Sequence, residues 1–126
     1  MDLLDKVVVL EHDASTFGFQ WETTAQIMQQ IHSECIEIQE HLDDGEVIAH
    51  PDALQEEIGD LLHAVFSLCV FCNVSPRETL AKTLDKFERR LNAVKEISKE
   101  QGTSDLKGVP FDKLMAIWQH AKKRVG

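Results

Sequence analysis

The stretch TAQIMQQIHSECIEIQEHL, residues 24–42, decides the fold. Its apolar side chains recur at intervals of four and seven residues, at Ile27, Ile31, Ile38 and Leu42. This spacing predicts a long amphipathic helix over 24–42 with one face directed at a core. The sequence Asp43-Asp44-Gly45 then supplies a stop signal.

Further helices are predicted on both sides of this stretch. A second long helix begins at Pro51 and ends near Asn73, with an apolar stripe between Leu54 and Cys69. Ser75 then caps a third helix, because Pro occupies its first position and Glu its third. The apolar residues of that helix follow a 4-3-4-3 spacing: Leu80, Leu84, Phe87, Leu91 and Val94.

Shorter helices are expected over 2–12 and 111–123, with loops at 17–21 and 101–110. The aromatic residues of 17–21 fit either a hydrophobic plug between helices or a wall on which a base stacks. No strand pairs or repeats are apparent. We therefore expect one all-α domain over residues 1–126, with a four-helix-bundle-like architecture.

Composition narrows the classes of function. The chain has 126 residues, of which 43% are hydrophobic and 28% charged, as in soluble globular proteins. A formal net charge of −9 argues against a polynucleotide partner, although a divalent cation can mediate between acidic side chains and a small polyphosphate. The apolar runs are too short for a membrane span or a signal peptide, so a cytoplasmic location is expected.

The three cysteines are Cys35, Cys69 and Cys72. An odd number within helical segments argues against a disulfide framework. A lone Cys-x-x-Cys without a second pair is also a weak sign of a zinc or redox site. Packing in buried helical segments is the expectation for all three.

Two pairs of acidic residues have helical spacing. Glu34 and Glu37 lie three residues apart, as do Glu57 and Asp60, so the members of each pair share a helix face. Both pairs are displaced from the apolar stripe in the same rotational sense. If the two long helices are antiparallel neighbours, all four carboxylates converge beside the seam. A single acidic pair is usually solvated surface, so the prediction depends on the match between the two pairs.

Either protonation or a bound cation must relieve the repulsion in a cluster of carboxylates, and a divalent metal is the expected solution. Hard oxygen ligands suit Mg²⁺ or Mn²⁺ better than zinc. Gly59 lies inside the predicted helix that begins at Pro51, where glycine lowers helix stability by about 1 kcal/mol relative to alanine. A close approach of another element at this position would explain the glycine. His63 follows Asp60 by three residues, but a di-iron bundle needs a second Glu-x-x-His helix. His41 lies four residues after Glu37, which is the wrong spacing.

These motifs resemble the MazG-like nucleoside triphosphate pyrophosphohydrolases. The signature of that family is Glu-Glu-x-x-Glu, a spacer, and Glu-x-x-Asp; here it reads SECIE at 33–37 and EIGD at 57–60. The resemblance also covers residues 17–21, 56–62, 86–90 and 118–122, and so most of the chain. Family members often carry a basic residue and a further acid where this chain has Gln30 and Ser33.

The resemblance implies the all-α pyrophosphatase fold and a homodimer or higher oligomer. It also implies Mg²⁺-dependent cleavage of a nucleoside triphosphate to the monophosphate and pyrophosphate, as nucleotide-pool housekeeping. The catalytic and metal-binding residues would be Glu34, Glu37, Glu57 and Asp60. The substrate-binding residues would be Lys86, Arg90, Trp118 and Lys122.

Other functions stay open at this point. A dUTPase-like or phosphoribosyl-ATP pyrophosphohydrolase activity would use a related carboxylate bundle. A noncatalytic helical module that binds nucleotide or a protein partner would keep the fold without the turnover.

Overall fold

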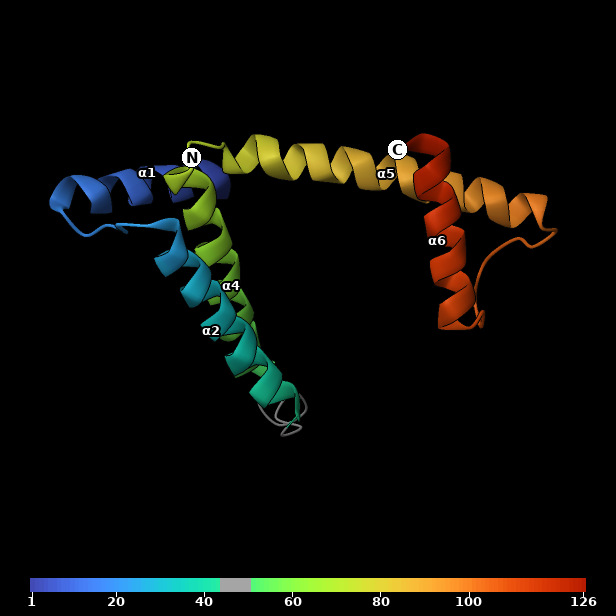
Figure 1. The fold of residues 1–126 in the computed structure, drawn as a ribbon, viewed down its shortest axis with the longest axis horizontal. Coiled ribbons are helices and arrows are strands. Elements are labelled where there is room, and N and C mark those ends of the chain that lie inside the picture. Colours follow the sequence, from blue (N-terminus) through green and yellow to red (C-terminus); the bar gives the residue numbers. More distant parts are fainter. Residues whose placement is uncertain (44–50) are drawn as a thin grey trace. The chain divides into compact units, whose positions relative to one another are not determined.

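A computed structural model describes residues 1–43 and 51–126 of the chain (Figure 1). The described part is entirely helical apart from turns and loops, which confirms the all-α prediction. The helices are α1 (Leu3–Phe17), α2 (Thr24–Asp43), α4 (Pro51–Phe71), α5 (Pro76–Glu100) and α6 (Phe111–Val125). The stop predicted at Asp43-Asp44-Gly45 falls largely outside the described residues.

The chain forms two compact units: an amino-terminal unit, Met1–Thr79, and a carboxy-terminal unit, Leu80–Gly126. The amino-terminal unit contains α1, α2, α4 and the first turn of α5. The single domain predicted over 1–126 stays a prediction.

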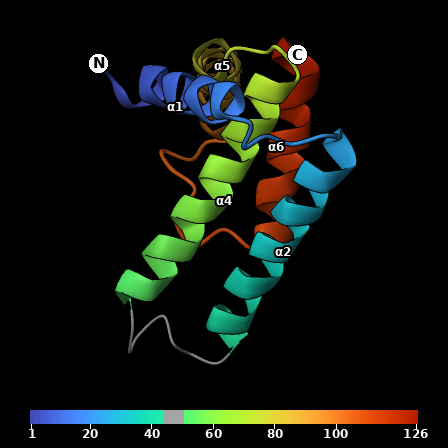
Figure 2. The same cartoon turned by 90° about the vertical axis from the view of Figure 1, so that its left-hand side faces the viewer.

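The α2 and α4 helices form the framework of the amino-terminal unit. They lie side by side and antiparallel, so that the end of α2 and the start of α4 meet at one end of the pair (Figures 1 and 2). The stripe residue Ile27 is completely buried, and Ala64 of α4 is also buried. The predicted neighbouring arrangement of the two long helices is therefore present.

The α1 helix is longer than its predicted range of 2–12. It continues to Phe17 and ends at Gly18, which has a φ of 99° and whose N–H reaches the Ser15 carbonyl. Glycine adopts this left-handed conformation without the steric cost that other residues carry, so it ends helices well. The aromatic segment expected to be a loop thus begins as helix, and the Phe17 side chain is 90% exposed.

Polar contacts connect α1 to the start of α5 within the amino-terminal unit. Asp2 caps α1 by accepting a hydrogen bond from the Asp5 N–H at 3.0 Å, and this bond lowers the pKa of Asp2. Arg77 pairs with Asp2 and lies 3.4 Å from Asp5. The predicted cap of α5 is present as well, since Ser75 Oγ accepts from the Glu78 N–H at 3.1 Å.

The carboxy-terminal unit has its own small core. Ala93 and Ile97 of α5 pack with Ile117 and Ala121 of α6, and Leu106 of the connecting loop covers them. An ion pair also joins α5 and α6: Arg124 donates to both carboxylate oxygens of Glu100, at 2.9 and 3.2 Å.

The cysteines do not pack as expected. All three are free, but Cys35 and Cys72 are exposed and Cys69 is only half-buried. Their positions on α2 and at the end of α4 lie off the buried faces. The expectation of buried cysteines was wrong because it placed the helix segments, rather than the individual side chains, in the core.

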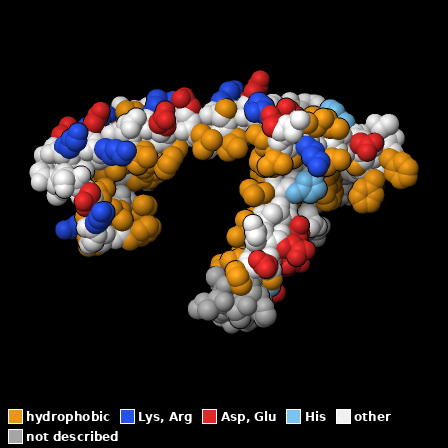
Figure 3. Space-filling model, turned by 180° about the vertical axis from the view of Figure 1, so that it is seen from behind, with side chains coloured by type: hydrophobic (Ala, Val, Ile, Leu, Met, Phe, Trp, Pro, Cys, Tyr) orange, Lys and Arg blue, Asp and Glu red, His pale blue; other side chains and the backbone are white. Residues whose placement is uncertain are grey.

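Large apolar side chains are exposed on both units of this single chain, as the orange surfaces in Figure 3 show. Examples are Ile36, Leu62, Leu84 and Phe87. Within the described residues, no individual helix has the length and apolar character needed to cross a membrane; α4 and α5 meet that test only as a bent pair, and only by length and composition.

Candidate metal centre

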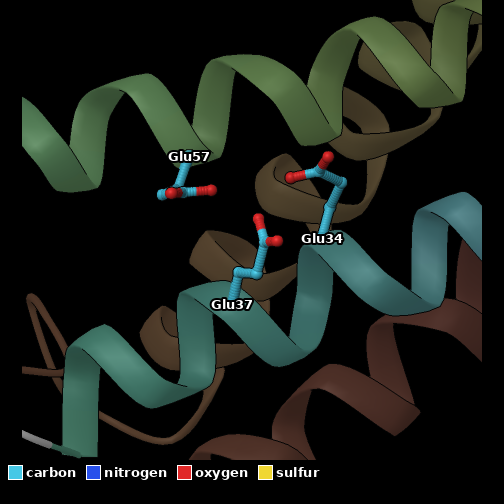
Figure 4. Close-up of side chains that lie close together, drawn as sticks. All are labelled: Glu34, Glu37 and Glu57. Atoms are coloured by element: carbon cyan, nitrogen blue, oxygen red, sulfur yellow. The ribbon is translucent and has the colours of Figure 1, made fainter.

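Three carboxylates meet between α2 and α4. Glu34 and Glu37 project from α2 toward Glu57 of α4 (Figure 4). One carboxylate oxygen from each residue lies within 4.8 Å of the others. Spacing of three residues places the two α2 side chains on one face, and the antiparallel neighbour supplies the third from across the seam.

Burial distinguishes two members of this cluster from an ordinary acidic surface, since Glu34 is buried and Glu57 half-buried, whereas Glu37 is exposed. Glu34 is only 8% exposed, and its Oε1 accepts a hydrogen bond from Gln30 Nε2 at 2.7 Å. Two further carboxylate oxygens of the cluster, Glu34 Oε2 and Glu57 Oε2, are buried and accept no hydrogen bond from the described residues. A buried anionic oxygen without a donor is costly, so both atoms are suited to a cation.

The electrostatics of the cluster point the same way. Burial raises the pKa of Glu34, and the charges of Glu37 and Asp60 raise it further, against the lowering effect of the Gln30 hydrogen bond. The neighbouring Glu57 carboxylate raises the pKa of Glu37. The site therefore resists full ionisation without a cation, which is the property expected of a metal-binding carboxylate cluster.

Asp60 lies close to the cluster but outside the group of three. Its charge raises the pKa of both Glu34 and Glu37, and it lines a pocket together with Glu34. The structure thus brings three of the four predicted carboxylates into mutual contact range and leaves the fourth, which is exposed, beside them.

A histidine accompanies the carboxylates. His41 Nε2 lies 3.6 Å from Glu57 Oε1, and the two side chains are 22% and 23% exposed. From the sequence, we considered His41 only as a ligand of a di-iron site. Its position four residues after Glu37 nevertheless puts it on the same face of α2. That spacing was the signal for a neighbour of the cluster.

The close approach expected at Gly59 is not found. A Cβ placed on this residue would meet no heavy atom of the described residues within 4 Å. The interpretation was wrong because α2 lies against another face of α4.

The four predicted substrate-binding residues belong to the carboxy-terminal unit. The Arg90 guanidinium lies over the Trp118 ring at 5.8 Å from its centroid, and Arg90 Nε donates to the Gly126 carbonyl at 3.1 Å. Phe87 packs at a tilt on Trp118, with 5.9 Å between ring centroids. Lys86 is exposed and Lys122 half-buried. The structure brings Arg90 and Trp118 together.

Comparison with known proteins identifies a family domain in the part of the chain that carries these acids. The model of the MazG nucleotide pyrophosphohydrolase domain matches residues 22–95, a range that contains α2, α4 and most of α5. The match includes all four predicted carboxylates, Lys86 and Arg90; Trp118 and Lys122 lie beyond it.

Two curated relatives match nearly the whole chain. The nucleoside triphosphate pyrophosphohydrolase/pyrophosphatase MazG of Thermotoga maritima is 33% identical over 113 residues, or 90% of this chain and 41% of the relative. The nucleoside triphosphate pyrophosphohydrolase of Escherichia coli K12 is 26% identical over 115 residues, or 91% and 43%. The chain thus spans about two fifths of the length of these relatives. By the domain match, it belongs to the MazG nucleotide pyrophosphohydrolase family.

Proposed function

We propose that this chain hydrolyses nucleoside triphosphates to nucleoside monophosphate and pyrophosphate in a Mg²⁺-dependent reaction. The observation that carries the proposal is the meeting of Glu34, Glu37 and Glu57 across α2 and α4, with ligand oxygens within 4.8 Å of one another. The names of the two curated relatives support the same reaction.

Glu34, Glu37, Glu57 and Asp60 would hold Mg²⁺, with Mn²⁺ as a substitute. The orphaned buried oxygens of Glu34 and Glu57 fit a hard cation, which prefers carboxylate oxygen and completes its shell with water and substrate phosphate. When bound, the ion neutralises charge on phosphate oxygens and favours ionisation of water.

The remaining steps belong to the side chains of the protein. One of the clustered carboxylates orients a water molecule for in-line attack on the polyphosphate and accepts its proton. Lys86, Arg90 and Lys122 stabilise the negative charge that develops on the leaving pyrophosphate. Trp118, which contacts both Phe87 and Arg90, contacts the nucleotide.

The proposal extends to assembly and location. A homodimer or higher oligomer would cover apolar side chains that are exposed in the single chain, such as Ile58 and Leu84. A role in the cytoplasm as a nucleotide-pool enzyme fits an acidic chain without polynucleotide or membrane partners. Size-exclusion chromatography with light scattering tests the assembly, and a monomer at micromolar concentration would contradict it.

A pyrophosphate-release screen tests the reaction. The standard nucleoside triphosphates are assayed with Mg²⁺, Mn²⁺ or chelator, using the wild type and the Glu57→Gln variant. We expect metal-dependent release that Glu57→Gln abolishes while the helical circular dichroism is unchanged. The control is Glu40→Gln on the exposed surface of α2, which should retain the wild-type rate. Undiminished release by Glu57→Gln would refute the metal-site assignment.

Substrate profiling separates the alternatives. Exclusive hydrolysis of dUTP would indicate a dUTPase-like enzyme, and exclusive hydrolysis of phosphoribosyl-ATP would indicate the corresponding pyrophosphohydrolase. Nucleotide binding without pyrophosphate release would indicate a noncatalytic module. Gln30, which donates a hydrogen bond to Glu34, is neutral where family members often have a basic residue. Substrate profiling therefore tests whether this difference changes the substrate or the turnover.

A further inference from the structure

A pocket opens beside the carboxylate cluster within the amino-terminal unit. It has a volume of about 960 Å³ and is bounded by α1, the segment after it, α2 and α4. Glu34 and Asp60 lie on its wall, together with the aromatic side chains of Phe19 and Trp21. Ligand pockets in proteins commonly enclose roughly 300–1,000 Å³, so this space is large enough for a nucleoside.

A second polar group lies on the same pocket wall. Glu11 of α1 accepts a hydrogen bond from Ser67 Oγ at 2.6 Å, and His63 Nε2 lies 2.8 Å from the same oxygen, Oε1. The Glu11 side chain is 17% exposed and Ser67 is buried. Glu11 lines the pocket, and among the described residues both contacts of its carboxylate are made at Oε1, which leaves Oε2 without a protein donor.

The two polar groups lie at different depths along α4. Asp60 marks the end beside the metal centre, and Ser67, seven residues later, marks the end at Glu11. At 1.5 Å per residue this separation is about 10 Å along the helix axis. Phosphate at Asp60 and the far edge of a base at Glu11 would match the two ends of one nucleotide.

We infer that Glu11 reads the base of the nucleotide and makes the pocket prefer guanine to uracil. An ionised carboxylate only accepts hydrogen bonds. Guanine presents two adjacent N–H donors on its pairing edge, which match a carboxylate. Uracil presents one N–H between two carbonyl oxygens, and a carboxylate placed against a carbonyl is repelled. Ser67 and His63 position Glu11 and make no contact with the base.

This inference rests on the proposed function for the identity of the ligand, but its test does not require turnover. Binding is measured by calorimetry in Mg²⁺ with the α,β-imido analogues of GTP and UTP, which resist cleavage between the α and β phosphorus atoms. We expect the wild type to bind the GTP analogue about tenfold or more tightly than the UTP analogue, the discrimination typical of a paired hydrogen-bond contact to a base.

The informative variant is Glu11→Gln. If the new amide oxygen keeps the Ser67 hydrogen bond, its NH₂ group faces the base and donates to a carbonyl. The preference should then fall to about one or reverse toward UTP, because an acceptor has become a donor at the same place. A merely structural role for Glu11 would weaken both analogues equally and leave the ratio unchanged.

Two further variants complete the test. Asp13→Asn removes a charge from the exposed side of α1 and should keep the wild-type ratio. Ser67→Ala removes the donor that positions Glu11, so the ratio should fall even if Glu11→Gln does not fold. Equal binding of the two analogues by the wild type, no binding of either, or an unchanged ratio in the variants would overturn the inference. Absence of pyrophosphate release together with a GTP preference would instead refute only the proposed reaction.

Discussion

Replacing Glu34 by Gln should stabilise the metal-free protein and remove its response to Mg²⁺. The amide keeps the shape of the carboxylate, and its oxygen can still accept the Gln30 hydrogen bond. It removes one charge from a cluster whose oxygens lie within 4.8 Å. At that distance, two unit charges repel by about 3.5 kcal/mol at an effective dielectric constant of about 20. Relaxation and water reduce the gain to about 1–2 kcal/mol.

Thermal unfolding followed by circular dichroism measures this effect. For a chain of this length, the gain corresponds to a rise of about 4–8 °C in Tm with chelator at pH 7.5. With Mg²⁺ at ten times its Kd, the wild type should gain about 1.4 kcal/mol, while the variant gains nothing. Glu40→Gln, on the same helix but outside the cluster, should match the wild type in both buffers.

The pH dependence gives an independent check. The pKa of Glu34 in the folded protein is raised above the ordinary value of 4.5, so the folded state binds more protons than the unfolded state between those two values. Stability of the metal-free wild type therefore falls as pH rises through this window. The advantage of Glu34→Gln should be smallest near pH 4.5 and complete above the window. A variant less stable than the wild type at pH 7.5, or one that keeps the Mg²⁺ shift, would refute this account of the cluster.

Three other substitutions give further predictions. Asp60→Asn should lower the pKa of both Glu34 and Glu37 in the metal-free protein, because its charge raises both, and carboxyl NMR titration would detect the change. Asp52→Asn, in the first turn of α4, is the control, and unchanged titrations in Asp60→Asn would place the aspartate too far away. Gly18→Ala should destabilise the protein by about 1 kcal/mol because φ is positive there. Gly59→Ala should stabilise it by about as much, since the helix has room for the methyl group, and urea unfolding would expose a wrong sign in either variant.

Local patterns predicted the elements well where periodicity and caps agreed. The stripe from Ile27 to Leu42 predicted α2 to within one residue at its end, and the Ser75 cap predicted the start of α5. The α1 helix was predicted too short, because the aromatic segment 17–21 suggested a loop. Gly18 was itself the signal for the true end, as a glycine after the last helical turn.

The candidate site was predictable to the extent that it follows from helix periodicity. The spacing of Glu34 and Glu37, and the matching offset of Glu57, are properties of α2 and α4 that survive into the structure. The contact of Glu11 with His63 and Ser67 joins residues 52 and 56 positions apart and depends on how α1 crosses α4. No local pattern encodes that crossing.

The carboxylate cluster and Glu11 lie on different helices, which affects how the sequence of such a protein can change in evolution. The clustered acids come from α2 and α4, whereas Glu11 comes from α1, which is fastened by side-chain bonds to Ser67 and to Arg77. Mutations on the inner face of α1 can therefore accumulate without displacing a residue of the carboxylate cluster. If the proposed roles hold, exchange of this one helix would change the preference for the base while the proposed metal site is inherited unchanged.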